Sequence, residues 1–448
     1  MKKHAPRSEE QPISENASEQ ETLAVTPSQQ PEKGLLRTFT SLQHRNYRLY
    51  WFGQMISLMG TYMQTIGQAW LVLELTHSAL QLGVVGALQF LPVLLFSIFG
   101  GVFADRWPKR RVLLVTQSAA MAQAFLLWLL IATGTIQLWH IYVLAMLLGI
   151  TISLDQPTRS AFVVEMVGRE DLPNAIALTS LLANLSRIVG PGLGGIIIAA
   201  SGVSMLFLLN ALSFLAVLVA LALIDSSELY AQALQPGNAD ERQKTWRSVR
   251  EGIDYVWKTP AISLIIVVVG VVLLFGANFN VILPLFATDV LHAGAKGFGF
   301  LSAAMGIGAL LAALWLAWGN VRPTIRRVLL GTLIFTVLEV VFAISHLYLL
   351  SLVLIASVGA AESIFGALAV TTLQIVAPDH LRGRVNSVYI LFFTGSIPMG
   401  YLLAGWLSGL FGVAIGLLIC AFLSLLVIGA GWVWQKPADK NFAESIHL

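Results

Sequence analysis

Residues 80–133 read LQLGVVGALQFLPVLLFSIFGGVFA (80–104), DRWPKRR (105–111) and VLLVTQSAAMAQAFLLWLLIAT (112–133). Two apolar runs of 25 and 22 residues thus enclose a loop of seven residues, five of which are charged. A helix needs about 20 mostly apolar residues to cross the hydrocarbon core of a bilayer. This segment therefore predicts two membrane-spanning helices joined by a short basic loop.

The same alternation continues over the whole chain of 448 residues. Apolar residues make up 56% and charged residues 11%, whereas soluble domains carry roughly 25% charged residues. This composition excludes a disordered chain, a coiled coil and a soluble enzyme, and the short basic clusters argue against a nucleic-acid-binding face. Twelve spans are predicted, at about 48–74, 80–104, 112–133, 138–163, 173–200, 203–224, 262–290, 298–319, 326–345, 348–375, 384–411 and 412–434.

The distribution of positive charge predicts the orientation of these spans. Of the 27 lysines and arginines, 25 lie in segments that are cytoplasmic if both ends of the chain are. Lys296 lies outside, and Arg187 lies within a span. Because cytoplasmic loops carry such an excess of Lys and Arg, we expect both termini in the cytoplasm and a multi-pass protein of a bacterial-type inner membrane.

The two halves of the chain resemble one another weakly. With a shift of 216 residues, Gly83 falls on Gly299 and Arg110 falls on Arg326. We predict an all-α integral membrane protein with two pseudo-symmetric halves of six helices each, a layout of many secondary transporters. The predicted parts are a disordered cytoplasmic tail (1–44), a first bundle (45–224), a cytoplasmic linker (225–260), a second bundle (261–434) and a cytoplasmic tail (435–448).

The loop after the second span resembles the loop signature of the major facilitator superfamily, G-x-x-x-D-R-x-G-R-R. The matching residues are Gly101, Asp105, Arg106, Lys109 and Arg110, and Pro108 stands where the family usually has Gly. Such charges at the cytoplasmic surface can hold two halves together in one state and release them in another. The resemblance implies a cytoplasmic gate; the alternative is a set of basic residues that only anchors the topology.

The fifth span reads RIVGPGLGG from Arg187 to Gly195, which is similar to the G-P-x-x-G-G motif associated with exporters of this superfamily. Glycines let two helices approach closely, and a proline bends a helix by removing one backbone hydrogen bond. We therefore predict a close helix contact at Gly190, Pro191, Gly194 and Gly195, and the resemblance favours export. Tight packing without directional meaning is the alternative.

One face of the first span is polar. Its members lie within about 80° of one another at 100° per residue: Gln54, Ser57, Thr61, Gln64 and Gln68. Three glutamines facing lipid would be costly, so this polar stripe faces protein or a water-filled cavity. In the superfamily this helix lines the substrate cavity, which makes the stripe a candidate substrate site; hydrogen bonding between helices is the alternative.

Ionisable residues within the spans are few, and each is expensive in a membrane. Asp155 lies one turn from Arg159 in the fourth span and could pair with it or with Arg187. A structural ion pair and a role in coupling or gating are equally open for Asp155 and Arg159. Glu362 of the tenth span is our first candidate for a proton-titrating group. Glu339 of the ninth span is a further candidate, with an interhelical hydrogen bond as the alternative.

Residues 68–80 and 382–385 are similar to the branch of the superfamily that holds enterobactin and multidrug exporters. The resemblance implies a secondary active transporter, not an enzyme, that exchanges protons for an amphipathic organic molecule by alternating access. The alternatives are an uptake permease for a small solute and a membrane subunit that depends on a partner ATPase. The chain has no G-x-x-x-x-G-K-[ST] loop of its own.

Histidine and cysteine suggest no metal chemistry. The eight histidines are scattered, and Cys420 is the single cysteine. Neither a metal nor a cofactor is predicted. The expected partners are a small-molecule substrate and the lipid bilayer, with no nucleic acid, and we expect the monomer to be functional.

Overall fold

The computed structural model describes residues 35–230, 251–319 and 321–446, without the side chains of residues 35–38, 97–106 and 436–446. The predicted tail up to residue 34 and residues 231–250 of the predicted linker lie outside the described residues. Within the described ranges the regular structure is helical throughout. The prediction of an all-α chain is therefore confirmed.

The helices of the first part of the chain are α1 (Arg45–Thr76), α2 (Ala79–Arg106), α3 (Lys109–Ala132), α4 (Leu138–Val167) and α5 (Leu172–Leu223). Those of the second part are α7 (Pro260–Gly276), α8 (Phe279–Leu285), α9 (Gly294–Trp318), α10 (Ile325–Ala343), α11 (Tyr348–Val376), α12 (Arg382–Phe411) and α13 (Val413–Ile446). Shorter segments are η1 (Leu35–Gln43), η2 (Ser226–Glu228), the π-helical η3 (Phe286–Val290) and a helical stretch at 251–258.

Most helix boundaries fall within a few residues of the predicted spans. The 52-residue α5 contains two of these spans, and its backbone leaves helical geometry between them at Gly202, where φ is +79°. Gly412 separates α12 from α13 with a φ of +83°. Glycine adopts such positive φ values without steric cost, which explains why the chain turns there. In the described part of the chain, nine helical stretches are long and apolar enough to cross a membrane.

The predicted span 262–290 is found as one apolar stretch, Pro260–Val290, but its helix is interrupted. Residues 262–290 form α7, α8 and η3 instead of a single helix, and the break lies at Ala277 and Asn278. The buried Asn278 amide donates hydrogen bonds to the carbonyl oxygens of Leu274 (2.8 Å) and Phe275 (3.0 Å). These bonds satisfy carbonyl groups that the interrupted helix leaves without helical partners, as irregular backbone at membrane depth requires.

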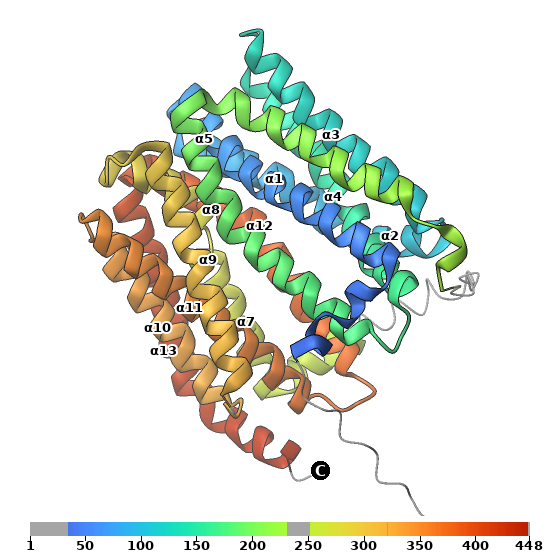
Figure 1. The fold of residues 1–448 in the computed structure, drawn as a ribbon. Coiled ribbons are helices and arrows are strands. Elements are labelled where there is room, and N and C mark those ends of the chain that lie inside the picture. Colours follow the sequence, from blue (N-terminus) through green and yellow to red (C-terminus); the bar gives the residue numbers. More distant parts are fainter. Residues whose placement is uncertain (1–34, 231–250, 320, 447–448) are drawn as a thin grey trace, which may run out of the picture. The chain divides into compact units, whose positions relative to one another are not determined.

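Two groups of helices pack around apolar cores. One group, α1 to α5, encloses a cluster that includes Phe162 and Phe214, and the other, α7 and α9 to α13, packs around Phe335 and Phe365. Figure 1 shows the first group in blue to green and the second in yellow to red. The pairs α2–α12 and α5–α9 join the two groups. Many large apolar side chains, such as Leu349, point outward, as expected for a surface that meets lipid.

Candidate functional site

The predicted gate residues lie at the end of α2 and the start of α3. Gly101, Asp105 and Arg106 belong to the end of α2, and their side chains lie outside the described residues. Lys109 is described: its Nζ lies 3.1 Å from Oε1 of Glu165 on α4, and only 5% of its side chain is exposed. This ion pair ties the start of α3 to α4, and no sequence pattern had indicated Glu165 as the partner.

Arg110 ties the start of α3 to the end of α5. Its guanidinium donates hydrogen bonds to the carbonyl oxygens of Leu221 (2.7 Å) and Ala222 (2.8 Å) and to the Ser226 hydroxyl (2.8 Å). A cation is favoured at a helix C-terminus by the helix dipole. Beside it, hydrogen bonds from the hydroxyl and then the backbone N–H of Ser227 lower the pKa of the Asp225 carboxyl.

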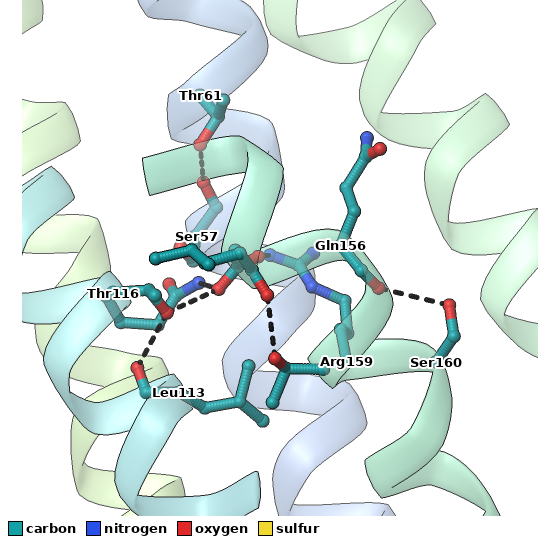
Figure 2. Close-up of polar contacts among 11 residues, drawn as sticks. Ser57, Thr61, Leu113, Thr116, Gln156, Arg159 and Ser160 are labelled. Atoms are coloured by element: carbon teal, nitrogen blue, oxygen red, sulfur yellow. Dashed lines mark hydrogen bonds and ion pairs between the residues drawn. The ribbon is translucent and has the colours of Figure 1, made fainter. Parts of the chain in front are cut away.

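Asp155 is the centre of a buried polar network between α3 and α4. Its Oδ1 accepts hydrogen bonds from the Thr116 hydroxyl (2.8 Å) and the Gln117 amide (2.7 Å), and its Oδ2 pairs with Arg159. Figure 2 shows Thr116 and Arg159 approaching each other from their two helices. When the Gln54 side-chain amide of α1 is oriented with its oxygen toward the guanidinium, this oxygen also accepts hydrogen bonds from Arg159. The network thus links three helices. Of the two partners predicted for Asp155, Arg159 and Arg187, the structure has the ion pair with Arg159 of the same helix.

The central part of the polar stripe on α1 is also engaged with other helices. The buried Gln64 accepts a hydrogen bond from Asn210 of α5 (2.6 Å) and donates one to Gln123 of α3 (2.9 Å). Thr61 donates to the backbone carbonyl of Ser57 (2.9 Å), one turn earlier. These contacts hold α1 against α3 and α5, and α1 packs along α5.

A cavity of about 310 Å³ lies between α1, α2, α5, α8, α9 and α12. Its polar lining consists of Tyr62, Thr65, Gln68, Gln89, Arg187, Asn280, Ser302 and Tyr401. Gln68 is the member of the stripe that lines it. The lining does not include Gln54, Ser57, Thr61 or Gln64.

Aromatic rings and amides lie side by side in this central cavity. Gln68 donates a hydrogen bond to Gln89 (2.9 Å), and Asn280 donates one to the Tyr401 hydroxyl (2.5 Å). The Phe90 ring packs edge-to-face on Tyr401, with the ring centroids 5.7 Å apart. A mainly apolar pocket with a few convergent polar groups suits a small amphipathic molecule. Gln89 and Asn280 were missed from the sequence, although polar residues inside apolar spans are the signal for such sites.

The lining of this cavity includes one charged residue, Arg187, and does not include Glu362. Arg187 of α5 is exposed, and no carboxylate in the described ranges forms an ion pair with it. The half-buried Glu362 of α11 interacts electrostatically with Arg187, and both interact with Tyr401. Glu339, by contrast, is fully buried on α10, and neither of its carboxylate oxygens has a hydrogen-bond partner in the described part of the chain.

The glycine motif of α5 forms two helix contacts. A Cβ built on Gly195 would lie 2.7 Å from the Ala295 carbonyl oxygen and 2.9 Å from Gly299 Cα, both on α9. On another face, a Cβ on Gly190 would lie 2.6 Å from Tyr62 Cβ of α1. At both positions a larger residue would push the helices apart, so the motif produces close packing.

A matching contact joins α2 to α12. A Cβ built on Gly405 would lie 2.6 Å from the Ala79 carbonyl oxygen and 3.2 Å from Gly83 Cα. Gly83 and Gly299 are the residues that the internal repeat aligns. Both glycine contacts therefore join the two helix groups, and both lie near the helix ends at Ala79 and Gly294.

Comparison with known proteins identifies the family of this chain. The family model described as transmembrane secretion effector matches residues 36–445. The enterobactin exporter EntS of Escherichia coli O1:K1 / APEC is 27% identical over 396 residues, which cover 86% of this chain and 92% of that protein. The multidrug efflux pump Tap of Mycolicibacterium fortuitum is 28% identical over 390 residues, which cover 84% of this chain and 92% of that protein.

Solved structures show the same fold. The crystal structure of the nucleoside transporter NupG superimposes with a TM-score of 0.70 at 11% identity, covering 87% of this chain and 99% of that chain. At this identity the likeness concerns the fold alone. The family model, however, spans nearly the whole chain, and the chain therefore belongs to the transmembrane secretion effector family of the major facilitator superfamily, a family of multi-pass membrane transporters and not of enzymes.

Proposed function

We propose that this transporter exports amphipathic small molecules, such as drugs or siderophore-like compounds, in exchange for protons. The observation that carries the proposal is the central cavity, which is lined by α1, α2 and α5 from the predicted bundle 45–224 and by α8, α9 and α12 from the predicted bundle 261–434. A volume of about 310 Å³ is within the range of small-molecule sites. The relatives named for export of enterobactin and of multiple drugs support the direction and the substrate class.

The transport cycle is alternating access between two six-helix halves with twelve spans in total. The glycine contacts α5–α9 and α2–α12 close the cavity at the end that the charge distribution assigns to the outer side. Export requires these two contacts to separate while the opposite end closes. Both termini lie in the cytoplasm, the membrane is the bacterial inner membrane, and one chain is the functional unit.

Arg187 and Glu362 couple substrate to protons. They belong to different halves and interact electrostatically, and Arg187 lines the cavity. A substrate that brings positive charge into the cavity beside Arg187 favours the ionised form of Glu362, and this links substrate binding to proton release. Asp155 and Arg159, which pair within α4, instead hold the first half together.

Proton release on substrate addition tests the coupling. Purified protein in weakly buffered detergent solution receives a lipophilic cation, and the pH change is recorded for the wild type, Glu362→Gln and the matched control Glu74→Gln. Glu74 is exposed at the end of α1. We expect release from the wild type and from Glu74→Gln only. Equal release from Glu362→Gln would remove Glu362 from the mechanism.

The gate residues Gly101, Asp105, Arg106, Lys109 and Arg110 control the cytoplasmic end. Lys109 and Arg110 hold α3 against α4 and α5, which keeps the loop in place. Asp105→Asn should abolish transport and leave membrane insertion unchanged, as measured by substrate flux and by the amount of protein in the membrane. Normal flux in this variant would eliminate the gate role.

A further inference from the structure

Glu339 is a buried acid with an unusual position. Its side chain is 0% exposed on α10, and it packs against the last residue of α7. A Cβ built on Gly276 would lie 2.8 Å from Oε2 and 3.0 Å from Oε1 of Glu339, and 2.7 Å from the Phe335 ring. Only glycine leaves room for the carboxyl group at this point of α7.

The surroundings of Glu339 do not compensate a negative charge. Neither carboxylate oxygen has a hydrogen-bond partner in the described part of the chain. Glu362 of α11 and Cys420 of α13 are the titratable groups that interact with it electrostatically, and α7 carries no ionisable side chain. No cation faces it from these three helices within the described residues. An ionised carboxylate is strongly disfavoured in such a site, whereas the neutral acid is tolerated.

The carboxyl group lies beside the break between α7 and α8. Gly276 ends α7, Asn278 bridges the break, and Asn280, two residues further on, lines the central cavity. On the other side, a Cβ on Gly400 of α12 would lie 2.6 Å from the Leu274 carbonyl oxygen, so α12 packs tightly against the same turn. Movement of the break would therefore change the cavity and the packing around Glu339 together.

We propose that Glu339 holds a proton in the conformation described here and releases it when the α7–α8 break moves. In that step the O–H bond of the carboxylic acid breaks, the proton passes to water that enters the opened packing, and the carboxylate keeps the electron pair. Closure of the break takes up a proton again. Glu339 thus acts as a positioning residue that links protonation to the shape of the cavity. Its link to transport rests on the proposed function, but its protonation in this conformation does not.

Infrared spectroscopy of the full-length protein tests the protonation without any substrate. The difference spectrum between the wild type and Glu339→Gln at neutral pH reports the carboxyl group that is lost. We expect loss of a carboxylic acid C=O band, because the wild type holds the proton. Loss of carboxylate bands instead would overturn the proposal. If substrate addition releases no proton, this counts against the proposed function. The prediction for the substrate-free spectrum is independent of that result.

Two glycines of α7 test the link to the break. A methyl group in Gly276→Ala meets the Glu339 carboxyl group and the Phe335 ring, whereas a Cβ on Gly270 has nothing within 4 Å. In Gly276→Ala we expect the carboxylic acid band to weaken in favour of carboxylate, since the packing opens. Gly270→Ala should keep the wild-type spectrum. A wild-type spectrum in Gly276→Ala, or the same change in both variants, would contradict the link.

Discussion

Gly195→Ala is expected to force α5 away from α9 where the two helices are closest. The new Cβ would lie 2.7 Å from the Ala295 carbonyl oxygen and 2.9 Å from Gly299 Cα, whereas ordinary contact begins at 3.4 Å. Both neighbours are backbone atoms, so the helices must separate by about 0.5–0.7 Å. Overpacking of this kind costs about 1–3 kcal/mol. Because only the conformation with this contact bears the cost, its population relative to the open one should fall roughly 5- to 150-fold.

Double electron–electron resonance measures this shift. Spin labels at Thr135→Cys and Leu347→Cys, in a Cys420→Ser chain, report the distance between two loops of the predicted outer side. Gly192→Ala is the matched control in the same motif, because a Cβ there meets another side chain only at an ordinary 3.7 Å. We expect a longer distance to gain population in Gly195→Ala alone. An unchanged distance distribution, or the same change in the control, would show that the contact between Gly195 and α9 does not hold this conformation closed.

Two further predictions concern the cytoplasmic end of the first helix group. Glu165→Gln should lower the free energy of unfolding by about 3 kcal/mol, because Lys109 would keep its charge with 5% of its side chain exposed. Thermal unfolding checks this against Glu170→Gln, which changes an exposed carboxylate; equal midpoints would contradict it. The Asp225 carboxyl has a lowered pKa, so its stabilising contribution is complete above the ordinary value of 3.8 and is lost as the pH falls through the lowered value. Ser227→Ala should raise this pKa, as an NMR titration of the carboxyl carbon would show; an unchanged pKa would exclude the Ser227 hydroxyl as the cause.

Helix positions could be predicted from the sequence because lipid imposes a simple rule. About 20 apolar residues are needed for each span. The chain turns at Gly202 and Gly412 with positive φ values, which glycine adopts more easily than other residues. The break after Gly276 was not predicted, because Asn278 and Asn280 look like isolated polar residues in an apolar run. Its role depends on the carbonyl groups of Leu274 and Phe275, which only the folded chain presents to Asn278.

The candidate site could be predicted only in part. The polar stripe on α1 correctly indicated a helix face that avoids lipid, but a helical wheel does not tell which neighbour that face meets. Gln64 meets Gln123 and Asn210, whereas Gln68 meets Gln89 and the cavity. Such pairings join residues far apart in the sequence, so they follow from the packing of helices and not from local pattern.

Export is tested most directly in inside-out membrane vesicles, whose lumen corresponds to the exterior of the cell. Accumulation of enterobactin or a lipophilic drug is followed with the lumen acidified, with and without an uncoupler, for the wild type and Glu362→Gln. We expect wild-type vesicles to accumulate substrate, the uncoupler to prevent this accumulation, and the variant to accumulate none. Accumulation only in right-side-out vesicles, or accumulation that persists with the uncoupler, would contradict proton-coupled export.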